Sequence, residues 1–197
     1  MRSANRELHG GILIMIEITF LNIFIVISIA WLGIRILIAA RNHKVNWLYE
    51  VKLLTVYLCI VVIARIVYFP WHLENGHIGM LVFDPKRILP FGVNAVPFRH
   101  LFDIYEGWQR NLFGNIAMFI PVGLAWPFCF KKLDSIKKVV LAGFSFSLLI
   151  ELSQLLFYAR STDIDDLITN TAGVFIGAVA YFLLSRVFRK KKPGSNV

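Results

Sequence analysis

Several apolar runs, each close to the length of a bilayer crossing, constrain the fold of this chain more than any other feature. A transmembrane helix needs about 20 consecutive, mainly apolar residues. Hydrophobic residues make up 57% of the sequence and charged residues only 17%, so no separate water-soluble domain is expected. We therefore predict an all-α, polytopic transmembrane bundle in the cell membrane. Its spans are expected at residues 12–40, 48–68, 112–130, 139–157 and 167–188.

The basic residues predict the orientation. With five spans, three basic groups fall on one side of the membrane. They are Arg35, Arg41, Lys44 and Lys52, then Lys131, Lys132, Lys137 and Lys138, then Arg186 with residues 189–192. Because cytoplasmic ends of spans are enriched in Lys and Arg, this side is expected to be cytoplasmic, with the N-terminus outside and the C-terminus inside. The net charge of +9 then reflects topology and does not indicate nucleic-acid binding. The basic tail, residues 189–197, is expected to contact membrane lipids with anionic headgroups.

One connection, residues 69–111, is long and combines several prolines with many aromatic residues. Proline interrupts regular helix, whereas clustered aromatic residues are typical of a membrane interface and not of a disordered linker. We expect a structured outer cap with a short interfacial helix near residues 101–108. The spacing of His72, His77 and His100 matches no metal-ligand pattern, so surface or packing roles are expected for them.

An acidic stretch, residues 162–166, leads directly into the last apolar run. One interpretation is structural: Asp163 caps the last helix, and Asp165 and Asp166 complement the helix dipole in its first turn. That interpretation does not explain Glu151. This residue lies three positions before Gln154 and therefore on the same helical face.

Other polar residues are expected at similar depths inside the spans. Charged residues inside a membrane normally face the bundle interior and find partners, so we expect Arg65 to pair with Glu151. The functional interpretation is one outward-opening polar pocket. Its candidate binding residues are Arg65, Asn115, Glu151, Gln154, Arg160, Asp163, Asp165, Asp166 and Asn170.

No cofactor is evident, but oxygen ligands of the kind that divalent cations prefer are present. Asp163, Asp166 and Asn170 could hold such a cation. The sequence has no HExxH motif, no Ser-His-Asp order and no phosphate-binding glycine loop, so no catalytic residue is assigned. Gly173 and Gly177 form a small-xxx-small pair, which usually indicates helix packing.

Four short segments, in this order and spacing, resemble the VanZ-like family. They are residues 94–98 (NAVPF), 115–123 (NIAMFIPVG), 151–154 (ELSQ) and 162–166 (TDIDD), the last followed by Asn170, Gly173 and Gly177. The resemblance divides the chain into a two-span extension at 1–80, a VanZ-like membrane domain at 81–188 and the basic tail at 189–197. The family's name-giving member differs at the positions of Arg160 and Asp165, which makes these two residues weaker candidates.

The resemblance also implies a role, because the name-giving member is an accessory factor in resistance to teicoplanin-type glycopeptide antibiotics. We expect the pocket to bind an envelope lipid, a lipid-linked cell-wall precursor or the glycopeptide, and thereby to reduce susceptibility. One alternative is an intramembrane enzyme in which Glu151 or Asp166 acts as a general acid or base on a lipid-linked substrate. Another alternative is a structural subunit of an envelope complex.

Overall fold

The computed structural model describes residues 16–43, 45–69, 73–74, 76–83, 92–98, 108–157, 160 and 162–190. Its helices are α1 (Phe20–Asn42), α2 (Trp47–Tyr68), α3 (Trp108–Cys129), α4 (Ile136–Gln154) and α5 (Ile164–Lys190). Short strands complete the described part: β1 (Ile16–Ile18), β2 (Leu73–Glu74), β3 (His77–Ile78), β4 (Leu81–Phe83), β5 (Val93–Asn94) and β6 (Thr162–Asp163). The predicted all-α class is confirmed, and each predicted span coincides with a helix.

Four of these helices are long and apolar enough to cross a membrane: α1, α2, residues 111–129 of α3, and residues 164–188 of α5. The chain is therefore a multi-pass membrane protein. The run expected as a span at 139–157 forms α4, which has 19 residues but carries Lys137, Lys138 and Glu151 and does not join the four. A crossing by α4, and with it the orientation of the chain, stays a prediction.

The chain forms two compact units, which are described separately. The first contains residues 1–94 and 150–163, and the second contains residues 95–149 and 164–197. The boundary falls inside α4, whose last turn belongs to the first unit. The domain boundary predicted at residue 80 from the resemblance stays a prediction.

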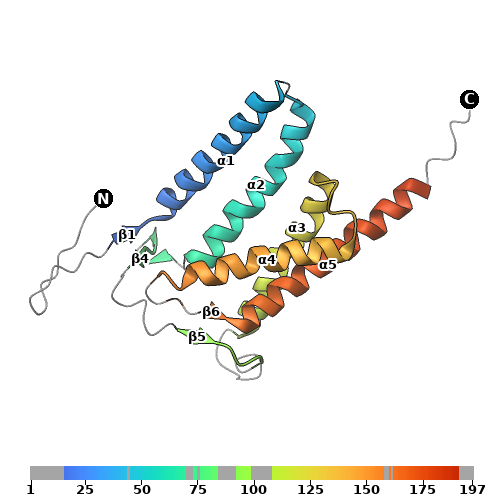
Figure 1. Ribbon diagram of the computed structural model, residues 1–197. Helices are drawn as coiled ribbons and strands as arrows, with labels where there is room; N and C mark the ends of the chain where they lie inside the picture. Colours follow the sequence, from blue (N-terminus) through green and yellow to red (C-terminus); the bar gives the residue numbers. More distant parts are fainter. Residues whose placement is uncertain are drawn as a thin grey trace, which may run out of the picture. The chain divides into compact units, whose positions relative to one another are not determined.

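In the first unit, α1 and α2 form an antiparallel helical hairpin (Figure 1). Thr19 caps α1 through a reciprocal capping box with Asn22, and Asn46 caps α2 by accepting the backbone N–H of Tyr49 at 3.1 Å. Between the helices, His43 takes a left-handed backbone conformation with φ of 52°. The left-handed His43 and the Asn46 cap explain why the chain reverses direction between α1 and α2.

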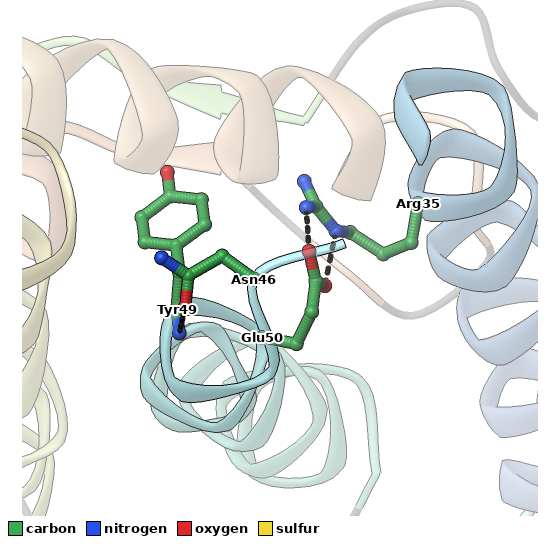
Figure 2. Close-up of polar contacts among 4 residues, drawn as sticks. All are labelled: Arg35, Asn46, Tyr49 and Glu50. Atoms are coloured by element: carbon green, nitrogen blue, oxygen red, sulfur yellow. Dashed lines mark hydrogen bonds and ion pairs between the residues drawn. The ribbon is translucent and has the colours of Figure 1, made fainter. Parts of the chain in front are cut away.

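Polar contacts hold the hairpin together where α1 ends and α2 begins. The Arg35 guanidinium binds the Glu50 carboxylate through two nitrogens, with 2.8 Å from Nε to Oε2, as Figure 2 shows. The same guanidinium lies 5.9 Å from the centre of the Tyr49 ring. Nearer the middle of the helices, the hydroxyls of Ser28 and Tyr57 are 2.8 Å apart. The apolar side chains of α1 stay outside any protein core, since α1 has no buried residue.

The long connection contributes strands to the first unit. β1 pairs antiparallel with β4, β2 pairs antiparallel with β3, and β5 pairs in parallel with β6. In the last pairing Asn94 is opposite Asp163. The interfacial helix expected near residues 101–108 falls almost entirely outside the described residues, as do His72 and His100.

In the second unit, α3 packs closely against α5 through glycines on both helices. A Cβ atom on Gly173 would lie 2.2 Å from the carbonyl oxygen of Ile116, and one on Gly177 would lie 2.2 Å from that of Ile120. From the other side, a Cβ on Gly123 would lie 2.2 Å from the carbonyl oxygen of Val174. Glycine at these positions lets the two backbones touch, as in small-xxx-small packing of membrane helices.

Candidate functional site

Glu151, one turn before the end of α4, is buried and connects that helix to β6. Glu151 is only 2% exposed. The Glu151 carboxylate accepts the backbone N–H of Asp163 at 3.1 Å, and its backbone carbonyl accepts the hydroxyl of Thr162 at 2.6 Å. Both contacts hold β6 against the end of α4 within the first unit.

Asp163 lies in β6 and directly precedes the first residue of α5, which is the expected N-cap position. The side-chain amide of Asn94 donates to both oxygens of its carboxylate, at 3.1 and 3.2 Å. The backbone supports this contact, since Thr162 donates its N–H to the carbonyl of Gly92 at 2.9 Å. Two of the segments that carry the family resemblance therefore meet at Asn94 and Asp163.

Gln154 and Arg160 complete the polar side chains of this region. Gln154 is 7% exposed, and its side-chain carbonyl oxygen accepts no hydrogen bond within the described part of the chain. The half-buried Arg160 guanidinium donates to the backbone carbonyl of Tyr68 at 2.8 Å. Burial lowers the pKa of Arg160, because it disfavours the charged form. Arg65 donates to the carbonyl of Phe69 at 3.4 Å, and its pairing with Glu151 stays a prediction.

The second unit holds the other two acidic residues of the predicted site, Asp165 and Asp166, in the first turn of α5. Asp166 accepts a hydrogen bond from the side-chain amide of Asn115 on α3, with 2.7 Å between Nδ2 and Oδ1. Asp165 is 5% exposed and accepts the backbone N–H of Phe98 at 2.6 Å. Phe98 has a left-handed backbone conformation at this contact, with φ of 65°. Both aspartates therefore bind specific donors in addition to any interaction with the helix dipole.

Asn170 lies one turn further along α5 and is 2% exposed. Its side-chain nitrogen donates to the hydroxyl of Ser147, a fully buried residue of α4, at 2.9 Å. Its side-chain oxygen accepts no hydrogen bond from the residues that the structure describes. A buried amide oxygen without a donor inside an apolar helix pair is a costly feature, so it marks Asn170 as a candidate for ligand binding.

The nine predicted site residues thus fall into two groups. We call Arg65, Glu151, Gln154, Arg160 and Asp163 the α4-end cluster, and Asn115, Asp165, Asp166 and Asn170 the α5-start cluster. The expectation that all nine line one pocket stays a prediction. The structure adds Asn94, Ser147 and Tyr68 as contacts of the predicted residues. Asn94 could have been found, since it belongs to a segment that carries the resemblance, whereas Ser147 and Tyr68 have no distinguishing signal.

A cation site gains no support from the described residues, which contain no group of three or more His, Cys, Asp or Glu side chains arranged to hold a metal ion. Asp163 falls in the α4-end cluster, and Asp166 and Asn170 fall in the α5-start cluster. Asp163 and Asp166 accept hydrogen bonds from side-chain amides, and Asn170 donates one to a hydroxyl.

Comparisons with known proteins agree with the resemblance found in the sequence. The family model described as VanZ/LLP1 matches residues 53–185, which include most of α2 and all of α3 and α4. Protein VanZ from Enterococcus faecium is 36% identical over 100 residues, a match that covers 51% of this chain and 58% of that relative. The chain thus matches little more than half the length of this relative. No solved structure matches the fold.

Proposed function

The chain belongs to the VanZ/LLP1 family, and on this premise we propose that it lowers susceptibility to teicoplanin-type glycopeptides by binding an envelope lipid or a lipid-linked cell-wall precursor. The binding groups are polar side chains of the α4-end and α5-start clusters. No bond of the ligand is broken in this proposal.

One observation carries it: within the described part of the chain, two buried carboxamides have a carbonyl oxygen that accepts no hydrogen bond. Neither Gln154 Oε1 nor Asn170 Oδ1 has a hydrogen-bond partner among the described residues. A buried acceptor without a donor costs about 1–3 kcal/mol, so a chain under no functional constraint would gain stability from an apolar residue of similar size at Gln154. At Asn170 the same cost is set against the hydrogen bond to Ser147. A ligand with hydroxyl, amide or ammonium donors would satisfy such an oxygen in either cluster. Lipid headgroups and the sugar or peptide parts of cell-wall precursors carry such donors.

The acidic residues support binding more than catalysis. Asp163, Asp165 and Asp166 accept hydrogen bonds from amide groups of neighbouring segments. Such contacts hold the carboxylates in place within the protein, which fits a binding site better than an acid or base that must exchange protons. The Gly173 and Gly177 pair does not favour a role as a structural subunit, because both glycines already pack against α3 of the same chain.

The test compares Asn170→Leu and Gln154→Leu with the wild type in a susceptible host. Leucine has the branched shape of asparagine and lacks one heavy atom of glutamine, and it offers no acceptor. We expect both variants to reach wild-type abundance in the membrane, to lose protection against teicoplanin, and to lose the lipid that co-purifies with the wild type, as measured by mass spectrometry. Thr171→Val is the matched control, because the bond that the Thr171 hydroxyl makes among the described residues is to the Leu167 carbonyl of its own helix, at 2.7 Å.

The control variant should retain both protection and the co-purifying lipid. If Asn170→Leu and Gln154→Leu protected as well as the wild type at equal abundance, an ordered water would be a sufficient partner for the two oxygens. The proposal would then be wrong. A co-purifying lipid with a uniformly modified headgroup would instead support the enzyme alternative.

A further inference from the structure

Two arginines reach the same end of α2 from distant parts of the sequence. Arg160, in the connection between α4 and α5, donates from Nη2 to the carbonyl oxygen of Tyr68 at 2.8 Å. Arg65, in the last turn of α2, donates from Nη1 to the carbonyl oxygen of Phe69 at 3.4 Å. Because Tyr68 and Phe69 are consecutive, the two guanidinium groups bind adjacent carbonyls.

Arg160 is held in place on both its backbone and its side chain. Its backbone N–H donates to the carbonyl of Phe157 at 3.3 Å. The Phe157 ring packs edge-on against the ring of Tyr68, with 5.8 Å between their centres, and the Tyr68 hydroxyl is hydrogen-bonded to that of Ser153. Tyr68, whose carbonyl binds Arg160, is therefore itself held by two other contacts.

The guanidinium of Arg160 has more donors than this contact uses. A guanidinium carries five N–H donors. Within the described part of the chain, Arg160 makes its hydrogen bond to Tyr68 and no ion pair with a carboxylate. It is nevertheless half-buried, and burial lowers its pKa. A partly desolvated cation without a counter-charge is unfavourable, and an anionic ligand would relieve that cost.

Capping of α2 is the simpler explanation, since basic side chains often bind the last carbonyls of a helix. One donor is sufficient for that role, and Arg65 alone would supply it. The second guanidinium, that of Arg160, keeps N–H donors that bind no described residue. Their planar arrangement matches the geometry of a phosphate group.

The position along α2 indicates which anion is available. Tyr68 is the last residue of a helix that is long and apolar enough to span the membrane. The end of such a helix lies at the level of the headgroups, where the phosphates of lipids are concentrated.

We propose that Arg160, with Arg65 beside it, binds the phosphate oxyanion of a lipid. This inference deepens the proposed function and rests on it, because it assigns the ligand a phosphate group. The same chemistry would recognise inorganic phosphate, so the experiment separates the two sources.

The experiment uses the full-length protein purified in a neutral detergent. Tryptophan fluorescence is titrated with dioctanoyl phosphatidic acid, and with dioctanoylglycerol as the phosphate-free control. We expect saturable binding of the phosphate-bearing lipid alone. Arg160→Gln should weaken this binding about tenfold or more, as expected for loss of a charge-assisted hydrogen bond, and Arg160→Lys should fall between the two. Thermal unfolding of each variant checks that it is folded.

Arg41→Gln is the matched control, since Arg41 is an exposed residue in the last turn of α1, at the opposite end of the helical hairpin. It should bind with wild-type affinity. If inorganic phosphate displaces the lipid, the site recognises the oxyanion itself; if it does not, recognition requires the lipid. Equal affinity of the wild type and both Arg160 variants, or equal affinity for the two lipids, would overturn the inference.

A susceptibility assay on the same variants separates this inference from the proposed function. Lost lipid binding by Arg160→Gln together with full protection against teicoplanin would support the phosphate site and contradict the proposed function. Unchanged lipid binding together with lost protection would contradict the phosphate site and leave the proposed function standing.

Discussion

Asn115 on α3 donates its side-chain amide to the carboxylate of Asp166 on α5, with 2.7 Å between the two atoms. This hydrogen bond joins two helices that are apolar enough to span the membrane. A charged residue at the end of such a helix is best tolerated when it has a specific partner. The finding changes the interpretation of Asp166, whose simplest role from sequence was to complement the dipole of its own helix.

The first prediction measures this bond by a double-mutant cycle. Asn115→Ala and Asp166→Ala should each lower the free energy of unfolding by about 1–3 kcal/mol, because either change leaves a polar group without its partner. The double variant should lose clearly less than the sum of the two single losses. Chemical denaturation of the purified protein in detergent, followed by circular dichroism, measures all four forms.

If Asp166 acted through the helix dipole alone, Asp166→Ala would cost about 0.3–1 kcal/mol and would be additive with Asn115→Ala. Additivity within error would therefore show that the hydrogen bond between Asn115 and Asp166 contributes no measurable stability.

The second prediction concerns the glycines between α3 and α5. Gly177→Ala should destabilise the protein by about 1–3 kcal/mol, because the added methyl group would lie 2.2 Å from the Ile120 carbonyl oxygen and force the helices apart. Gly33→Ala is the matched control, since no atom lies within 4 Å of the Cβ position on Gly33 in α1. Alanine is the better helix former, so the control should be neutral or more stable by up to about 1 kcal/mol.

Thermal unfolding of both variants in the same detergent tests this prediction. Equal stability of Gly177→Ala and Gly33→Ala would show that α3 and α5 do not approach each other as closely as the structure has it.

The helices could be predicted from sequence because apolar length is a local property. Each expected span coincides with a helix whose bounds differ by only a few residues at most ends. The exception is α4, which is expected as a span on its apolar content but carries the three charged residues Lys137, Lys138 and Glu151 and is not among the four helices that are apolar enough to cross a membrane. Apolar content thus predicted the element correctly, and it did not establish a crossing.

The contacts of the acidic residues could not be predicted in the same way. Asn94 meets Asp163 through a two-residue parallel pairing, and Phe98 meets Asp165 through a left-handed turn. Neither segment has a periodic pattern, and both partners are distant in the sequence. The consequence is visible for Asp165, which the resemblance made a weak candidate but which is buried and binds a backbone N–H. Its burial indicates a role in the fold.

The third prediction concerns Glu151. Glu151→Ala should destabilise the protein by about 3–5 kcal/mol if Arg65 is its charge partner, because the change leaves a half-buried cation without its counter-charge. Arg65→Ala should behave alike, and the double variant should recover part of the loss. Glu151→Gln separates the charge from the hydrogen bond, since glutamine can still accept the N–H of Asp163.

Denaturation of the four forms gives the coupling energy between Arg65 and Glu151. Strict additivity, together with wild-type stability of Glu151→Gln, would reject the ion pair. Glu151 would then act only as the acceptor that connects α4 to β6.

The last prediction asks whether α4 crosses the membrane, which decides the orientation of the chain. Lys131 precedes α4 and Ser161 follows it, so single cysteines at these positions report on its two ends. In a background without Cys59 and Cys129, Ser161→Cys should react with a membrane-impermeant thiol reagent in intact cells. Lys131→Cys should react only after permeabilisation, because the basic residues around it favour the cytoplasmic side. Reaction of both cysteines from the same side would show that α4 does not cross the membrane. The number of spans would then be even, the two ends of the chain would share one side, and the predicted orientation would be wrong.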